Sequence, residues 1–175
     1  MKKLYLFFII VSVIFLAGCF NKKSAVDNRI EKNIKQTYEE RGENVDVNID
    51  TEKGELTFEN KDQGVLVKTS EQGDLELPDD WPKEVKVYPN GKLVAVVKND
   101  EGMHITIKVD DGLDKIKKWY DEQMQKTDWQ SEMNFNMGAS WMSSYKKGNY
   151  QLVFNAGPSE EESGNMLTIS YIQAK

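Results

Sequence analysis

Cysteine and histidine are almost absent from this sequence of 175 residues, in which Cys19 is the only cysteine and His104 the only histidine. A disulfide within the chain and a zinc site made of cysteines are therefore excluded. The folded part needs an ordinary apolar core for its stability, and the chain is long enough for one or two small domains.

The motifs of familiar enzyme classes are missing as well. Neither a GxxxxGK nor a GxGxxG phosphate-binding loop occurs, which excludes nucleotide-driven chemistry. A hydrolytic triad would have to use His104, which we expect to be an exposed histidine on a strand, on the face opposite Ile105 and Ile107. The available serines lie in no recognisable nucleophile motif: Ser131, Ser140, Ser143 and Ser144. We therefore predict no enzymatic activity and no cofactor, with an enzyme of unfamiliar design as the remote alternative.

Basic side chains are outnumbered, because 23 Lys and Arg face 29 Asp and Glu, and the formal net charge is −6. Removing residues 1–18 takes away Lys2 and Lys3 and no acidic residue, so the charge of the remainder becomes −8. An acidic surface repels polyanions, and nucleic acid is not an expected partner. The acidic clusters have neither a glycosidase arrangement nor EF-hand spacing, which leaves at most a weak calcium site at Asp110, Asp111 and Asp114.

The N-terminus combines a basic start with a long apolar run. Lys2 and Lys3 precede an almost unbroken apolar run, Leu4–Leu16, and small residues and Cys19 follow. This layout is typical of a secretory signal. The alternatives are a signal cleaved elsewhere and an uncleaved membrane-spanning helix, because the run approaches the roughly 17 to 25 residues that span a bilayer.

The ending Leu16-Ala17-Gly18-Cys19 resembles the lipobox of bacterial lipoproteins. In that family a diacylglyceryl group is transferred to the cysteine sulfur, and the chain is cleaved just before the cysteine. The resemblance implies that residues 1–18 are a signal peptide, that residues 19–25 form a lipidated tether, and that Cys19 anchors the protein on the extracytoplasmic face of the cell membrane. Two acyl chains meet the requirement for stable anchoring.

Residues 26–76 are predicted as a helix followed by a small β-meander. One helical stripe with four-residue spacing consists of Val26, Ile30, Ile34 and Tyr38. Gly42 marks the expected end of the helix. From Asn44 onward the apolar residues alternate with a period of two, in short runs separated by polar turns. Such a meander needs a cover for its apolar face, and we expect that cover to be the preceding helix.

Residues 77–175 are predicted as the second domain, which begins at a proline-rich boundary. Pro78 and Pro82 favour extended backbone. Trp81 between them is expected to fill an apolar edge, with an exposed aromatic for stacking on sugar rings as the alternative. Further along, Asn90-Gly91 predicts the turn of a hairpin.

A helix and a series of strands follow this hairpin. The buried stripe of the helix is predicted as Leu113, Ile116, Tyr120 and Met124. The connections are too short for parallel crossovers, so consecutive strands are expected to pair antiparallel. The predicted fold class is α+β: an antiparallel sheet with one helix packed on a face, preceded by an N-terminal helix and a small β-meander.

A second resemblance rests on the segments LPDDWP and VYPNGK, the helical pair Trp119-Tyr120 and the exit residue Trp129. This pattern looks like small, largely uncharacterised lipoproteins of Gram-positive bacteria. The resemblance spans roughly residues 75–175 and implies no catalytic residue.

The remaining candidates for a site are aromatic residues of the second domain: Trp119, Trp141 and Tyr145. Aromatic residues at strand and helix spacing more often belong to the core. The leading hypothesis is a membrane-anchored module without enzymatic activity that binds an envelope protein or a cell-wall component. The alternative is a lipoprotein that binds a small molecule or an ion. A cavity lined by these aromatics would favour the alternative, and a flat apolar patch would favour the interaction module.

Overall fold

The computed structural model describes residues 25–159 and 163–173. The predicted signal peptide (1–18), the lipidation site Cys19 and all of the tether (19–25) except its last residue lie outside the described residues. Within the described part, neither helix is long and apolar enough to cross a membrane.

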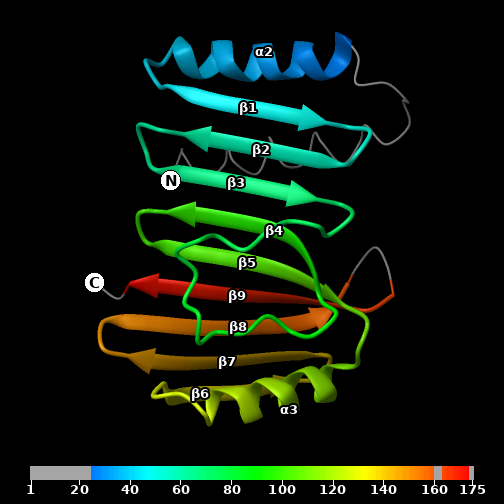
Figure 1. The fold of residues 1–175 in the computed structure, drawn as a ribbon, viewed down its shortest axis with the longest axis vertical. Coiled ribbons are helices and arrows are strands. Elements are labelled where there is room, and N and C mark those ends of the chain that lie inside the picture. The colour runs from blue at the N-terminus through cyan, green and yellow to red at the C-terminus, as the bar shows by residue number, and fades with distance from the viewer. Residues whose placement is uncertain (1–24, 160–162, 174–175) are drawn as a thin grey trace.

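The described chain forms one antiparallel sheet of nine strands in the order β1-β2-β3-β4-β5-β9-β8-β7-β6, together with two helices (Figure 1). The elements are α2 (Ala25–Glu39), β1 (Val45–Asp50), β2 (Glu55–Asn60), β3 (Val65–Ser70), β4 (Lys92–Asn99), β5 (Gly102–Val109), α3 (Leu113–Met124), β6 (Gln130–Met137), β7 (Ser140–Lys147), β8 (Tyr150–Pro158) and β9 (Asn165–Gln173).

The fold has the helices and the antiparallel sheet of the predicted α+β class, but strands dominate it and the arrangement differs from the prediction. The meander is joined to the later strands, because β3 pairs with β4 along residues 66–69 and 95–98. Strand β5 pairs with β9 rather than with β6, the next strand in the chain. The prediction that consecutive strands pair is wrong at this point, because α3 carries the chain from β5 to the far edge of the sheet.

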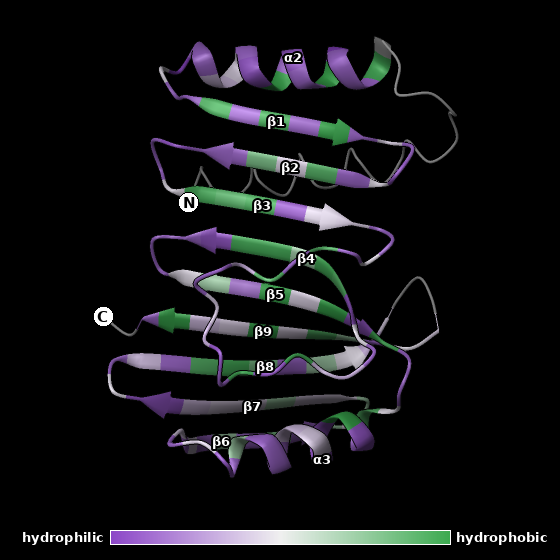
Figure 2. Cartoon of the chain, viewed as in Figure 1, coloured by the Kyte–Doolittle hydropathy of each residue, from purple (hydrophilic) through white to green (hydrophobic). Residues whose placement is uncertain are grey.

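Two apolar cores lie on opposite faces of this sheet. Residues that are directly paired across antiparallel strands share a face, and one such row consists of Val47, Phe58, Val67, Val97 and His104. Ile105 follows His104 in β5 and therefore lies on the other face. We call the face of this row the α2 face and the face of Ile105 the α3 face. Figure 2 shows the alternation of hydrophobic and hydrophilic residues along β1.

Helix α2 covers the α2 face at β1 and β2. Ile30, Ile34 and Tyr38 pack on the buried strand residues, and the rings of Tyr38 and Phe58 lie 5.4 Å apart. The predicted helix and its cover over the meander are confirmed. Val26 was predicted in the same stripe, but it is 54% exposed.

The larger core lies on the α3 face, where α3 and the β3–β4 connection cover the sheet (Figure 1). Three of the four residues predicted for the stripe of α3 are buried: Ile116, Tyr120 and Met124. Leu113 is partly buried against the same core. Trp81 is buried in this core rather than at an apolar edge, and its Nε1 donates to the carbonyl oxygen of Val85 at 2.9 Å; the alternative of an exposed aromatic is wrong.

The hairpin predicted at Asn90-Gly91 is wrong, because residues 84–88 form no strand. The turn itself exists: the Gly91 N–H donates to the carbonyl oxygen of Tyr88 at 3.0 Å, and Asn90 has a φ of 61°. It leads from an irregular connection into β4. Both edges of β4 are already paired, with β3 and β5, which leaves no position for a strand from the preceding segment.

Candidate functional site

A cavity of about 350 Å³ lies between the end of α3 and strands β6 and β7. Its described lining residues are Asp121, Met124, Gln125, Trp129, Ser131, Asn134 and Tyr145. The helix contributes residues at spacings of three and four, which place them on one side of α3. The sheet contributes residues of the α3 face, where Ser131 pairs with Tyr145.

The cavity exists because β6 presents small polar side chains to α3. The register between β6 and β7 shifts between Ser131 and Met133, which is the signature of a β-bulge. Beyond the bulge, Met133 and Phe135 pair with residues of the α2 face, and Asn134 faces α3 instead. The last turn of α3 therefore meets no large apolar side chain on β6, and space remains.

The lining combines three large, largely apolar side chains with polar groups and one charge. Met124, Trp129 and Tyr145 are buried, and Asp121 is the single charged residue among the described lining residues. Burial raises the pKa of the Tyr145 hydroxyl, the Ser143 hydroxyl opposes this shift, and the Asp121 carboxylate adds to it. The phenol is therefore protonated at neutral pH and available as a hydrogen-bond donor, with a carboxylate close enough to affect it.

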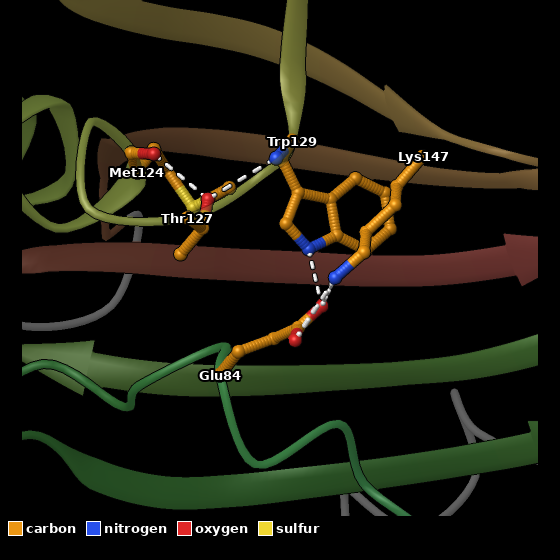
Figure 3. Close-up of polar contacts among 5 residues, drawn as sticks. All are labelled: Glu84, Met124, Thr127, Trp129 and Lys147. Carbon is orange, nitrogen blue, oxygen red and sulfur yellow. Dashed lines mark hydrogen bonds and ion pairs between the residues drawn. The ribbon is translucent and has the colours of Figure 1, made fainter.

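Trp129 is held in place by a residue from the β3–β4 connection, as Figure 3 shows. Its Nε1 donates to Oε1 of Glu84 at 2.8 Å, and the same carboxylate accepts from Nζ of Lys147 at 3.0 Å and 3.2 Å. Thr127 connects the end of α3 to this cluster, because its hydroxyl donates to the carbonyl oxygen of Met124 at 2.7 Å and accepts from the backbone N–H of Trp129 at 3.4 Å. Glu84 thus ties together three segments that are far apart in the sequence.

The charge of Glu84 is stabilised at this position. The hydrogen bond from Lys147 lowers the pKa of the Glu84 carboxyl, partial burial opposes this, and the hydrogen bond from Trp129 lowers it further. The carboxylate is therefore ionised across the neutral range, and Trp129 keeps a charged acceptor.

The three predicted binding residues have different positions. Tyr145 lines the cavity. Trp141 is fully buried next to it, and its Nε1 donates to Oδ1 of Asn134 at 3.0 Å. Trp119 does not line the cavity; it packs edge-on against Tyr120, with ring centroids 4.7 Å apart.

Sequence reasoning did not select Asp121, Gln125 or Asn134 for this site. A signal for the helical pair existed, because Asp121 and Gln125 lie four residues apart and flank the predicted core residue Met124. No comparable signal existed for Asn134, since its orientation depends on the bulge in β6.

The other residues considered for chemistry have structural partners. Nδ1 of His104 lies 2.8 Å from Oγ of Ser170 on the α2 face, and burial lowers the pKa of the imidazole. Asp111 accepts from the Tyr88 hydroxyl at 2.9 Å and from Nζ of Lys115 at 2.7 Å. Among the described residues, no group of three or more His, Cys, Asp or Glu side chains is placed to hold a metal ion.

Comparison with known proteins gives one result for this region. A family model described as START domain-like matches residues 93–164, which is less than half of the chain. The matched segment runs from β4 to the connection before β9, and it includes every described residue that lines the cavity. No curated protein and no solved structure matches the chain.

Proposed function

We propose that this protein is a lipid-anchored, extracytoplasmic ligand-binding module without enzymatic activity, which binds a small molecule in the cavity between α3 and strands β6 and β7. The observation that carries the proposal is the position of the cavity inside the segment similar to the START domain-like family. Its volume of about 350 Å³ falls at the lower end of the usual range for small-molecule sites, about 300 to 1,000 Å³.

The lining indicates a compact amphipathic ligand that carries a positive charge. The apolar surfaces of Met124, Trp129 and Tyr145 suit an aliphatic or aromatic body. Asp121 offers a carboxylate at the side of the cavity, and aromatic rings attract cations as well. Asn134 and Gln125 add amide groups that can orient the ligand.

A matched pair of probes tests this charge preference. Benzylamine is a cation at neutral pH, and benzyl alcohol has nearly the same shape without the charge. We expect benzylamine to bind with a dissociation constant on the order of 1 mM, which is ordinary for so few atoms, and to change the fluorescence of Trp129. Benzyl alcohol should bind more weakly.

Two variants make the assignment specific. Asp121→Asn should remove the preference for benzylamine, whereas Glu122→Gln, on an exposed residue of the same helix, should preserve it. If neither probe binds, or if both bind equally well to the native protein and to Asp121→Asn, the proposed site is wrong.

The anchor is the second part of the proposal and rests on the lipobox resemblance around Cys19. Metabolic labelling with a radioactive fatty acid should mark the native chain and leave Cys19→Ser unlabelled. A Cys19→Ser chain that still incorporates the label would contradict lipidation at this residue.

An interaction module for an envelope protein or a wall component is the second candidate function. The observation that favours it is the exposure of apolar side chains on β6, where Phe135 is 52% and Met137 60% exposed.

A further inference from the structure

Strand β6 is one edge of the described sheet, and beyond the bulge at Glu132 it lacks the usual protection of an edge among the described residues. Seven of its eight residues are exposed, and the eighth, Met133, is half-buried. Natural edge strands are normally protected by charges, prolines, β-bulges or a covering element. Strand β6 contains no proline or lysine, and its single charged residue is Glu132, at the bulge.

The opposite edge of the sheet shows this protection. Strand β1 carries Asp46 and Asp50, and Asp46 forms ion pairs with Lys61 at 2.6 Å and Lys35 at 3.6 Å. The two edges therefore differ, and only β6 offers an uncharged run of backbone, from Met133 to Met137.

This run is self-complementary. The sequence Met133-Asn134-Phe135-Asn136-Met137 reads the same in both directions. Antiparallel pairing of two such strands about Phe135 places Phe135 opposite its own copy, each Met133 opposite a Met137, and each Asn134 opposite an Asn136. A contact about a two-fold axis requires this kind of self-complementarity.

We propose that β6 pairs antiparallel with β6 of a second copy of this chain, in the register centred on Phe135. The pairing gives hydrogen-bond partners to the backbone N–H and C=O groups of Met133–Met137 that point away from β7. It also covers Phe135 and Met137, the two most exposed large apolar side chains of the strand. This inference concerns assembly, and it stands independently of the proposed ligand binding.

Charge and register are compatible with this dimer. In the proposed register Glu132 lies opposite Gly138 of the second copy, so the two Glu132 residues are six positions apart along the strand. At about 3.4 Å per residue this separation is about 20 Å, which exceeds the Debye length of about 8 Å at physiological salt. Like charges therefore do not oppose the pairing.

The contact also reaches the candidate cavity. Asn134 lines the cavity, and in the dimer Asn136 of the second copy lies directly opposite Asn134 on the same face of the sheet. The paired segment is short, so we expect a weak dimer, in the class of interfaces below about 1,200 Å². Confinement of anchored chains to a membrane surface would raise their effective concentration.

Cysteine crosslinking of the full-length chain in its membrane tests both the contact and its register. Directly paired residues have Cβ atoms about 4.5 to 5.5 Å apart, which a disulfide can join with a small adjustment. Phe135→Cys should give a disulfide-linked dimer on mild oxidation and non-reducing electrophoresis. Met142→Cys, on the adjacent strand β7 and paired with Phe135 in the same chain, is the matched control and should remain monomeric, as should the native chain with its Cys19.

The proposed register also predicts how cysteines at positions 133 and 137 crosslink. Met133→Cys alone and Met137→Cys alone should not crosslink efficiently, because each cysteine lies about 13 Å from its own copy. Chains carrying Met133→Cys and differently tagged chains carrying Met137→Cys, expressed together, should form the mixed dimer. Equal crosslinking of Phe135→Cys and Met142→Cys, or no mixed dimer, would overturn the proposal.

Sedimentation equilibrium of the full-length chain purified in detergent provides an independent measurement. Phe135→Lys should raise the dissociation constant of the dimer by about ten-fold or more, because it places two like charges at the centre of the contact. Val26→Lys, at an equally exposed position on α2, should leave it unchanged. A native chain that stays monomeric at its highest soluble concentration overturns the proposal. A Phe135→Lys chain that keeps the native dissociation constant of the dimer and loses only its affinity for lipid vesicles would also overturn the proposal, since that result would assign the surface to the membrane.

Discussion

Nε1 of Trp129 donates to Oε1 of Glu84 across 45 positions of sequence, at a distance of 2.8 Å. This bond joins the segment after α3 to the irregular β3–β4 connection, and Lys147 of β7 binds the same carboxylate. Because Trp129 lines the candidate cavity, the bond also determines the position of one cavity wall. Its energetic value can be measured by changing Glu84, which is not among the residues that line the cavity.

Glu84→Gln should destabilise the protein by roughly 1 kcal/mol. The amide can still accept from Trp129, but the charge-assisted bond from Lys147 is weakened, and the side chain is too exposed for a larger effect. Urea unfolding should therefore show a lower midpoint with an unchanged slope. Glu122→Gln on the exposed side of α3 is the control and should leave the midpoint within error. A native-like midpoint for Glu84→Gln would mean that the cluster contributes nothing measurable.

The contribution of Glu84 should depend on pH in the acid range. Its pKa in the folded protein is below the usual value of 4.5, so the ionised form is favoured by folding. The stability contributed by this group is therefore fully present above about pH 4.5 and is lost as the pH falls through the lower, folded-state pKa. The difference in unfolding free energy between the native protein and Glu84→Gln should be constant from pH 7 to about pH 5 and should shrink below that range. A difference that grows on acidification would contradict this sign.

Two neighbouring tyrosines should respond in opposite ways to loss of the hydroxyl. The hydroxyl of Tyr120 is buried with at most a weak contact to the backbone of Tyr88 among the described residues, so Tyr120→Phe should be neutral or slightly stabilising, within about 0.5 kcal/mol. The hydroxyl of Tyr88 donates to Asp111 at 2.9 Å, so Tyr88→Phe should lower the thermal midpoint.

Tyr120 also allows a check on the fold. Tyr120→Ala should cost about 3 to 5 kcal/mol, because it removes a ring that contacts Phe154 at a centroid distance of 4.6 Å. Calorimetry of Tyr120→Phe and Tyr120→Ala separates the effect of the ring from that of the hydroxyl. A strong loss of stability in Tyr120→Phe would show that its hydroxyl makes a strong hydrogen bond after all.

The smaller core should open more readily than the larger one. Among the described residues, the core on the α2 face (the α2 core) has four buried apolar residues and the core on the α3 face (the α3 core) has twenty. Local unfolding of α2, β1 and β2 should therefore need less free energy than global unfolding. Hydrogen–deuterium exchange should be faster in those elements than in β5, β8 and β9.

A pair of variants from opposite faces tests this difference. Val47→Ala, in the α2 core, should accelerate exchange only in α2, β1 and β2. Ile107→Ala, in the α3 core, should accelerate it throughout the sheet and cost about 2 to 5 kcal/mol. Uniform acceleration by Val47→Ala would indicate that the two cores unfold as one unit.

The sequence by itself determined the local elements of this protein. The four-residue spacing that ends at Tyr38 and Met124 specifies both helices, and the period-two runs specify most of the strands, because these patterns record which side of an element meets a core. The cover of α2 over the meander also followed from its apolar face. The signal peptide and the lipid anchor at Cys19 remain predictions from the sequence.

Only the tertiary structure decided how these elements combine. Strand β3 pairs with β4, β5 pairs with β9, and the two cores lie on opposite faces of the sheet. These features depend on contacts between distant segments that no local pattern encodes. The hairpin expected at Asn90-Gly91 does not form for this reason, since β4 is paired with β3 on one edge and with β5 on the other. The cavity and the free edge have the same origin. The bulge after Ser131 turns Asn134 toward α3 and Phe135 toward the opposite face, where no described residue pairs with the outer edge of β6.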